Sequence, residues 1–494
     1  MRAREAAHRV RLHAPRVGET EVEFGWDIEP NSELYEKNGF RLSFPPELDI
    51  AAVPQALWLR LALICLHTQW ALLRPCLVEL PYYIGPAERE FWQRMTDTAA
   101  IQIVAYGGEA RPGRAVELHD DGPALPPTKV PDTNGRVAAA FSGGKDSLIQ
   151  AGLLAELTEL PLLVTTTSVV TWNSDHFGAG RERVLSEVTR RLPVELVEVH
   201  SDYRTAWDNE FSRAEGCSLS VNELSDVLLY QATTLAAAAA SGIGRSFQAA
   251  EADLQYNASA RGEVIQHGHF VSSAVTHTAL DRLLRRFGLR LGSLTYPLHT
   301  DQIQPFLWRR YPEVAELQFS CWAANGAQAC STCQQCIEIT ILLLGEGISP
   351  RRAGIDPARV LAEWAPRQPD LRRQNRPRLH PLRLPRDKTV RIIQATSAER
   401  VAAILADDPR VEESVESYRQ LRARVLNENE SPLPHPGYIA GFLDRLDDDL
   451  REPLRAIFDE SFTPSNDPEL AAMCRRSESL SRWIADPLIS AERA

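Results

Sequence analysis

Six consecutive residues carry groups that suit a phosphate chain: Ser142, Gly143, Gly144, Lys145, Asp146 and Ser147. The two glycines lack Cβ atoms, so the chain can turn tightly there and a phosphate can approach the backbone N–H groups. The lysine supplies a positive charge, and the two serines supply hydroxyl donors. The aspartate would repel phosphate unless a divalent cation lay between them, which implies Mg²⁺. The stretch therefore predicts a loop that binds a pyrophosphate group.

This loop lies between an apolar run at 137–141 and an amphipathic segment at 146–157. A strand followed by a helix aims backbone N–H groups and the positive end of the helix dipole at an anion. The GxxxxGK[ST] nucleotide loop is excluded, because Ala139 stands where its first glycine belongs and an aspartate follows the lysine. A solvated glycine turn without chemistry is the alternative interpretation.

Four of the eight cysteines fall within sixteen residues: Cys321, Cys330, Cys333 and Cys336. Zn²⁺ binds four thiolates tetrahedrally, and a CxxC segment brings two sulfurs to one ion. Such a closed site leaves no position for water, so the predicted zinc would be structural. An iron–sulfur cluster and a chance grouping of buried cysteines are the alternatives.

The elements that must position these residues come from a segment between 136 and about 347. Further apolar runs lie at 162–170 and 194–199, and helical stretches lie at 181–192 and 224–240. Short apolar strands separated by helices predict parallel strands with right-handed crossovers, and hence a doubly wound α/β sheet. In such sheets ligands bind at the carboxyl ends of the strands.

The flanking segments divide the chain further. Residues 1–108 alternate strand-like and helix-like pieces, which predicts an α+β domain. Residues 109–135 are rich in Pro, Gly and Asp and predict a linker. Residues 348–494 begin with a basic, proline-rich stretch and continue as polar-faced segments, which predicts a basic linker and a helical region. The strands expected in the first domain are 20–26, 40–44, 76–84 and 101–107.

Composition limits the class of protein. A net charge of −12 disfavours a general binder of nucleic acid. The N-terminus has no export signal, and the most apolar segment, Ala56–Leu73, is broken by Arg60 and His67. We therefore expect that segment to be a buried helix and not a membrane span. A cytoplasmic protein is predicted, with cysteines that are thiols or metal ligands rather than disulfides.

SGGKDS resembles the PP-loop of the ATP pyrophosphatases, which react at the α-phosphate of ATP and release pyrophosphate. Together with the Cys-x8-Cys-x2-Cys-x2-Cys spacing, it resembles the 7-cyano-7-deazaguanine synthase family over roughly residues 136–347. The resemblance implies a PP-loop fold with ATP and Mg²⁺ at the loop and zinc at the cysteines. It implies that Arg181 adds a basic group and that adenine lies near these residues: Thr167, Ser168 and Val169. The catalytic residues that it implies are Ser142, Lys145 and Asp146.

The chain also departs from that family. The base-recognition segment is replaced after Asp253 by LQYNASARGEVIQHGHF, and an expected lysine is replaced near Asp301. Members with added flanking regions resemble components of bacterial antiphage operons. We expect an enzyme that adenylates a carboxylate, such as 7-carboxy-7-deazaguanine, and forms a nitrile or an amide, with a protein partner supplying the amine. The alternatives are a tRNA-modifying PP-loop enzyme such as a thiolase, with the basic stretch 372–391 contacting RNA, and a non-catalytic nucleotide-sensing scaffold.

Overall fold

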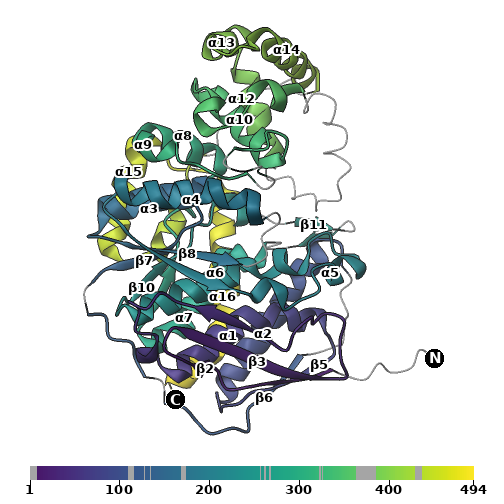
Figure 1. Ribbon diagram of the computed structural model, residues 1–494, viewed down its shortest axis with the longest axis vertical. Coiled ribbons are helices and arrows are strands. Elements are labelled where there is room, and N and C mark those ends of the chain that lie inside the picture. The colour runs from purple at the N-terminus through teal and green to yellow at the C-terminus, as the bar shows by residue number, and fades with distance from the viewer. Residues whose placement is uncertain are drawn as a thin grey trace, which may run out of the picture.

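The computed structural model describes most of the chain. The described residues are 8–108, 116–126, 128–133, 135–168, 174–255, 258–260, 263–265, 269–321, 324, 326, 328–362, 385–428 and 437–493. A large twisted sheet lies across the middle of the molecule, with helices above and below it (Figure 1).

The sheet has eleven strands. In spatial order they are β13 (Arg290–Gly292), β10 (Arg245–Phe247), β7 (Val137–Ala140), β8 (Leu162–Ser168), β9 (Glu195–Ser201), β4 (Gly39–Ser43), β3 (Glu21–Glu29), β1 (His8–Leu12), β5 (Cys76–Glu79) and β6 (Val116–His119), with β2 (Arg16–Val17) paired to β3. Strands β13, β10, β7, β8 and β9 are all parallel to one another, whereas β4 joins β9 in antiparallel register. The predicted α/β class with a largely parallel sheet is therefore confirmed.

The chain order of the parallel strands reverses between β7 and β10. From β7 the chain steps outward through β8 to β9, and then returns to add β10 and β13 on the other side of β7. Helices α3 (Lys145–Leu157) and α4 (Ser174–Arg191) lie on one face, and α6 (Val221–Ala240) and α7 (Ala274–Leu284) lie on the other (Figure 1). Such a reversal opens a crevice at the carboxyl ends of the two strands that flank it.

Local sequence explains where these helices begin. In α6, the Ser220 hydroxyl accepts a hydrogen bond from the N–H of Glu223, and the Glu223 carboxylate accepts one from the N–H of Ser220. This reciprocal cap satisfies two backbone donors at the start of the helix. Ser273 caps α7 through its hydroxyl in the same position. A short helix, α5 (Phe211–Ala214), precedes α6, and β11 (Ala258–Ala260) pairs with β12 (Glu263–Ile265) in a separate two-stranded sheet.

The N-terminal residues extend the central sheet. Leu42 and Ser43 of β4 pair with Ser201 and His200 of β9. Helix α1 (Gln55–Leu72) is buried along almost its whole length, as predicted, and packs against α6. Its Arg60 forms a buried double hydrogen bond with Glu88 at 2.7 and 2.8 Å, which explains a charge inside this apolar helix. None of the described helices is both long and apolar enough to cross a membrane.

Two sequence predictions for this region are corrected. The strand predicted at 101–107 is wrong, because these residues end α2 (Pro86–Ala105). The strand was predicted because polar Gln102 alternates with apolar residues, as in a strand with one exposed face. Gln102 is in fact buried, and its side-chain oxygen accepts a hydrogen bond from the N–H of Val271 at 3.0 Å. The predicted linker 109–135 contains a strand, β6, which pairs in parallel with β5. Proline and glycine around this short strand hid it.

The described residues after 348 form helices, as predicted, and no strand. The helices that follow β13 are α8 (Thr300–Arg310), α9 (Pro312–Ala315), α10 (Gln334–Glu346), α12 (Pro385–Ala395), α13 (Ala398–Ile404), α14 (Val411–Glu428), α15 (Asp448–Ser461) and α16 (Pro468–Arg493). Helices α12 to α14 lie at one end of the molecule, against α10 (Figure 1). Helix α16 instead returns to the other face of the sheet and packs between α2 and α7. The C-terminal residues therefore contact both faces of the protein.

Candidate functional site

The SGGKDS loop connects β7 to α3 at the carboxyl end of the central strand. Gly143 has φ of +79°, and a Cβ there would lie 2.9 Å from Cγ1 of Val184 on α4. A Cβ on Gly144 would lie 3.3 Å from the hydroxyl of Ser320. Gly143 is thus required by backbone conformation and by close packing, because both exclude a side chain.

Neighbouring segments hold the loop in place. The N–H of Phe319 donates to the Gly143 carbonyl at 3.0 Å, and the N–H of Lys145 donates to the Ser320 hydroxyl at 3.1 Å. Within the described part of the chain, the N–H groups of Ser142 and Gly143 have no hydrogen-bond partner. These two donors lie at the amino end of α3, where an anion is favoured.

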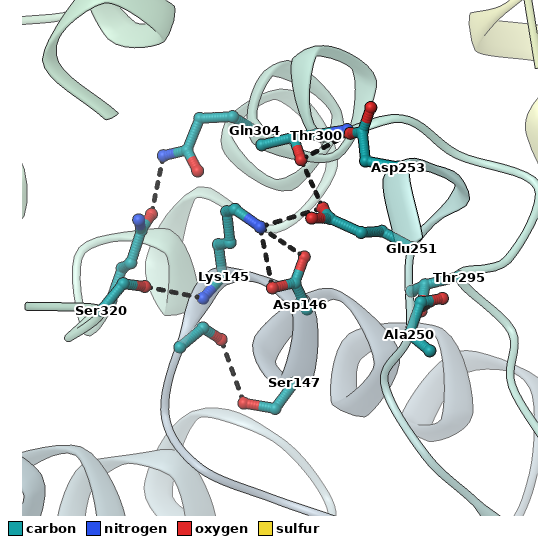
Figure 2. A network of polar contacts seen from close by, with 12 residues as sticks. Lys145, Asp146, Ser147, Ala250, Glu251, Asp253, Thr295, Thr300, Gln304 and Ser320 are labelled. Atoms are coloured by element: carbon teal, nitrogen blue, oxygen red, sulfur yellow. Dashed lines mark hydrogen bonds and ion pairs between the residues drawn. The ribbon is translucent and has the colours of Figure 1, made fainter. Parts of the chain in front are cut away.

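Lys145 is buried at the centre of a charged group (Figure 2). Its ammonium lies 2.7 and 2.8 Å from the two carboxylate oxygens of Asp146 and 3.1 Å from Oε2 of Glu251. Burial alone would lower the pKa of Lys145, but the carboxylates of Asp146, Glu251 and Glu338 outweigh it and raise that pKa. The lysine therefore stays charged at neutral pH.

Asp146 is less well compensated than its partner. Burial raises the pKa of Asp146 to about 6, although the Lys145 ammonium opposes this, and repulsion from Glu251 adds to the rise. A bound cation would favour the charged carboxylate, since opposite charge stabilises it. Asp146 and Glu251 thus both contact the Lys145 ammonium, and about a third of the Asp146 side chain is exposed to solvent.

Two acidic residues from the segment that follows β10 lie near the loop that follows β7 (Figure 2). Glu251 and Asp253 follow β10, and both contact Thr300 at the start of α8 (Figure 2). The N–H and the hydroxyl of Thr300 each lie 2.8 Å from Oδ2 of Asp253, and the hydroxyl also contacts Glu251. The residues of the SGGKDS loop and two carboxylates therefore meet at the point where the strand order reverses.

The residues expected near adenine lie at the end of the neighbouring strand, β8. The Thr167 hydroxyl is 2.6 Å from Nδ1 of His200, and the Ser168 hydroxyl is buried without a partner in the described structure. Val169 lies outside the described residues. Arg181 of α4 binds the end of β8, with one guanidinium nitrogen 2.7 Å from the Thr166 carbonyl oxygen. Burial lowers the pKa of Arg181.

The four predicted metal ligands come together. The sulfurs of Cys321, Cys330, Cys333 and Cys336 all lie within 4.8 Å of one another. The closest contacts are 3.5 Å between Cys333 and Cys336 and 3.9 Å for the Cys321–Cys333 and Cys330–Cys336 pairs. Four sulfurs at 2.3 Å around a tetrahedral ion would be about 3.8 Å apart. The cluster could therefore hold one metal ion such as zinc.

Backbone geometry around the cysteines also suits thiolates. The N–H groups of Thr332 and Cys333 donate to the Cys330 sulfur at 3.4 and 3.2 Å, and that of Cys330 donates to the Cys321 sulfur at 3.1 Å. Ser331 adopts a left-handed conformation, with φ of 56°, that turns these donors toward the sulfur. Cys321 directly follows Ser320, so the cysteine cluster is attached to the segment that contacts the SGGKDS loop.

Three residues of the site were not predicted from sequence: Glu251, Thr300 and Ser320. Glu251 carried a detectable signal, because it stands two residues before Asp253 in the segment that follows β10. Thr300 and Ser320 carried none, since each is a single hydroxyl distant in sequence from the loop. Only the folded chain brings them to Lys145 and to the acidic pair.

Helix α8 separates this site from a pocket on the other side of the helix. Thr300 and Gln304 face the loop side (Figure 2), whereas Asp301, Pro305 and Arg309 line a pocket of about 720 Å³. That pocket lies between α8, α10 and α12. Residues four apart share a helix face, so the two sets occupy different stripes of α8. The pocket is thus separate from the SGGKDS loop.

Comparison of the chain with protein-family models, with curated proteins and with solved structures finds no match.

Proposed function

We propose that this chain uses ATP to activate a carboxylate by adenylation, with release of pyrophosphate. The observation that carries the proposal is Lys145, held between Asp146 and Glu251 at a glycine turn where the strand order reverses. A glycine turn, a helix amino end and a buried lysine together suit a phosphate chain. The SGGKDS sequence, which resembles a PP-loop, supports ATP as the source of that chain.

The acidic residues suit a divalent cation. Carboxylate oxygens are the ligands that Mg²⁺ prefers. Asp146 and Glu251 both contact Lys145, and Asp253 shares the hydroxyl of Thr300 with Glu251. These residues would hold Mg²⁺ together with the phosphates, and the ion would supply charge neutralisation. Burial and repulsion from Glu251 raise the pKa of Asp146 although Lys145 contacts it, so a further cation beside this carboxylate would stabilise its charged form.

The reaction divides into two steps. An oxygen of the substrate carboxylate attacks the α-phosphorus of ATP, and the bond from that phosphorus to the bridging oxygen of pyrophosphate breaks. An amine then attacks the acyl carbon of the adenylate, AMP leaves, and the amine loses a proton as the amide forms. Lys145 and the loop N–H groups stabilise the negative charge that develops on the departing pyrophosphate. Positioning of the two reactants supplies the rest of the rate enhancement.

The proposed carboxylate is 7-carboxy-7-deazaguanine, and the proposed amine belongs to a protein partner. Support comes from the spacing of the four cysteines relative to the loop, which resembles 7-cyano-7-deazaguanine synthase. The altered segment after Asp253 favours a changed acceptor. Attack by ammonia would instead lead to the primary amide and, after dehydration, to the nitrile.

We further propose that the cysteine cluster holds a structural zinc ion. Four sulfurs fill the tetrahedral positions, so no site remains for water or substrate. The distances between the sulfurs favour one ion over a multi-iron cluster, whose ligands would have to stand farther apart. The ion would fix the segment that carries Ser320 against the phosphate loop.

A sulfur-transferring tRNA enzyme is the weaker candidate. It needs a reactive thiol outside the metal cluster, and the other four cysteines are Cys65, Cys76, Cys217 and Cys474. Burial raises the pKa of each of these thiols, to about 12 for Cys76 and about 11 for Cys474. Thiols with raised pKa values are poor nucleophiles at neutral pH. A non-catalytic nucleotide sensor remains the other alternative, and turnover distinguishes it.

Pyrophosphate release from ATP tests the activation step. Lys145→Met should lower release at least about a hundredfold, because the charge opposite the phosphates is lost. Lys129→Met is the matched control, since Lys129 is exposed and distant in sequence from the loop. Equal release by wild type and Lys145→Met would contradict the proposal, and ATP binding without turnover in the wild type would favour the sensor.

Mass spectrometry tests the acceptor. Incubation with ATP, 7-carboxy-7-deazaguanine and a cognate partner should add one deazaguanine acyl group to that partner through an amide. Conversion of the acid to free 7-cyano-7-deazaguanine with ammonia, and no adduct on the partner, would contradict the protein acceptor. The amine would then come from ammonia.

A further inference from the structure

A buried ion pair joins the C-terminal residues to the candidate site. The guanidinium of Arg391, on α12, contacts the carboxylate of Asp301 in the first turn of α8. The two side chains are only 12% and 3% exposed. Such a buried pair keeps one geometry more firmly than a surface pair, because little water can reach its charged groups and screen their attraction.

The residue before Asp301 is Thr300, which holds the acidic pair of the site. Its N–H donates to Asp253, and its hydroxyl lies between Asp253 and Glu251 (Figure 2). A hydroxyl has one hydrogen, so it donates to one of these carboxylates at a time. Glu251 in turn lies 3.1 Å from the Lys145 ammonium. Direct contacts therefore run from Arg391 on α12 to the phosphate loop.

The position of Thr300 matters because Glu251 and Asp253 carry like charges. Two close carboxylates repel one another unless donors and cations hold them. The amino end of α8 contributes favourable N–H groups and a positive dipole end, but only if its first turn stays in place. Asp301 lies in that turn, and the guanidinium of Arg391 contacts it.

We propose that Arg391 is a positioning residue for the nucleotide site. It does not touch the phosphate loop, but it fixes the first turn of α8, and through Thr300 it fixes Glu251 and Asp253. This role rests on the proposed function, because ATP with Mg²⁺ is the ligand of the site. It gives helix α12 a role that neither the SGGKDS loop nor the cysteine spacing implies. Removing the chain after residue 390 would accordingly weaken ATP binding itself.

Three variants and one control test this role. The variants are Arg391→Met, Asp301→Asn and the double substitution. The control is Arg245→Met, which breaks a 2.5 Å pair between Arg245, at the amino end of β10, and Asp449 of α15. That pair also joins the core to the C-terminal helices and is similarly shielded at its arginine, but it lies at the opposite end of β10 from Glu251.

Hydrogen–deuterium exchange provides a measurement that needs no ATP. We expect faster exchange at the N–H groups of Thr300 and Ala252 in Arg391→Met, because the first bonds Asp253 and the second bonds Leu298, just before α8. The double variant should show the same local increase, and Arg245→Met should not. Unchanged exchange at both groups in Arg391→Met would overturn the proposal.

Thermal stability and ATP affinity then separate positioning from simple stabilisation. Arg391→Met removes a cation that contacts the buried Asp301 carboxylate and should lower Tm, whereas the double variant also removes the charge of that carboxylate and should recover part of the lost Tm. The Kd for ATP with Mg²⁺ should rise about tenfold in both. Affinity that recovers together with Tm in the double variant would overturn the positioning role. Absence of ATP binding by the wild type would contradict the proposed function, while the exchange measurement would still decide the role of Arg391.

Discussion

Lys145 shows how single side chains in this protein depend on their neighbours. An isolated buried lysine loses its charge readily, because burial disfavours the ammonium. Here the carboxylates of Asp146 and Glu251 reverse that tendency and raise its pKa. The charge that a phosphate would meet is thus maintained by two residues from separate parts of the chain: Asp146 in the first turn of α3 and Glu251 in the segment after β10.

Two buried histidines, unlike Lys145, have lowered pKa values, and they make the folded protein less stable in acid. Burial lowers the pKa of His67, on α1, to about 4, although hydrogen bonds to the carbonyls of Leu63 and Ile64 oppose this. Burial, with repulsion from Arg445, likewise lowers the pKa of His277 to about 3. The unfolded chain takes up these protons near pH 6.5, whereas the folded chain resists them, so stability falls as the pH drops below that value.

We predict that His67→Leu makes the protein less sensitive to acid. The wild type should lose about 1.4 kcal/mol of unfolding free energy per pH unit for each such histidine between about pH 6 and pH 4. The variant lacks one of these protonation sites, so its stability should decline less steeply over that interval. Urea denaturation at several pH values measures the slope, and a slope equal to that of the wild type would refute the explanation.

At the scale of elements, Gly143 in the turn before α3 can be compared with Gly135, which precedes β7. Gly143 and Gly135 both have positive φ, at +79° and +63°. A Cβ at Gly143 would meet Val184 at 2.9 Å, whereas one at Gly135 would have nothing within 4 Å. Backbone strain is therefore common to both positions, and the steric clash is specific to the loop.

We predict that Gly143→Ala impairs the protein more than Gly135→Ala. Strain alone should cost about 1 kcal/mol at Gly135. At Gly143 the clash with α4 adds to this cost, and the displaced loop should also lower pyrophosphate release from ATP. Chemical denaturation and the release assay measure the two effects, and similar behaviour of the two variants would show that the packing against Val184 is unimportant.

The cysteine cluster acts on a second element, because α10 begins directly after Cys333 and contains Cys336 in its first turn. Metal binding by thiolates is coupled to folding of the segments that carry them. We predict that Cys333→Ser lowers the zinc content from about one per chain and lowers Tm. Cys474→Ser, outside the cluster, should leave the zinc content unchanged. A wild type without metal would contradict the proposed zinc site.

At the scale of the whole molecule, the N-terminal strands and the parallel strands form one sheet. The pairing of β4 with β9 covers an edge of the parallel strands, and α1 covers α6. An uncovered strand edge and a large apolar surface both promote aggregation.

We therefore predict that a fragment of residues 136–494 aggregates when it is produced alone. Light scattering and binding of an apolar dye measure this, with the full chain as the control. A soluble, monomeric fragment with the Tm of the full chain would instead show that residues 1–108 are an independent domain.

The sequence alone determined those features that depend on short segments. The glycines, lysine and aspartate of the loop, the cysteine spacing and the apolar α1 could all be recognised because each uses residues close together in the chain. The alternation of strands and helices also predicted the parallel part of the sheet, since periodicity reflects the face that each element buries.

Only the tertiary structure decided which distant residues complete the site. Glu251 and Ser320 contact Lys145, and Thr300 contacts Glu251, although these residues lie far apart in the sequence. The strand β6, the helical end of α2 and the contact between Arg391 and Asp301 likewise depend on partners far away in sequence. Pairing and burial between such partners are set by the packing of the whole chain, and no local pattern of residues encodes them.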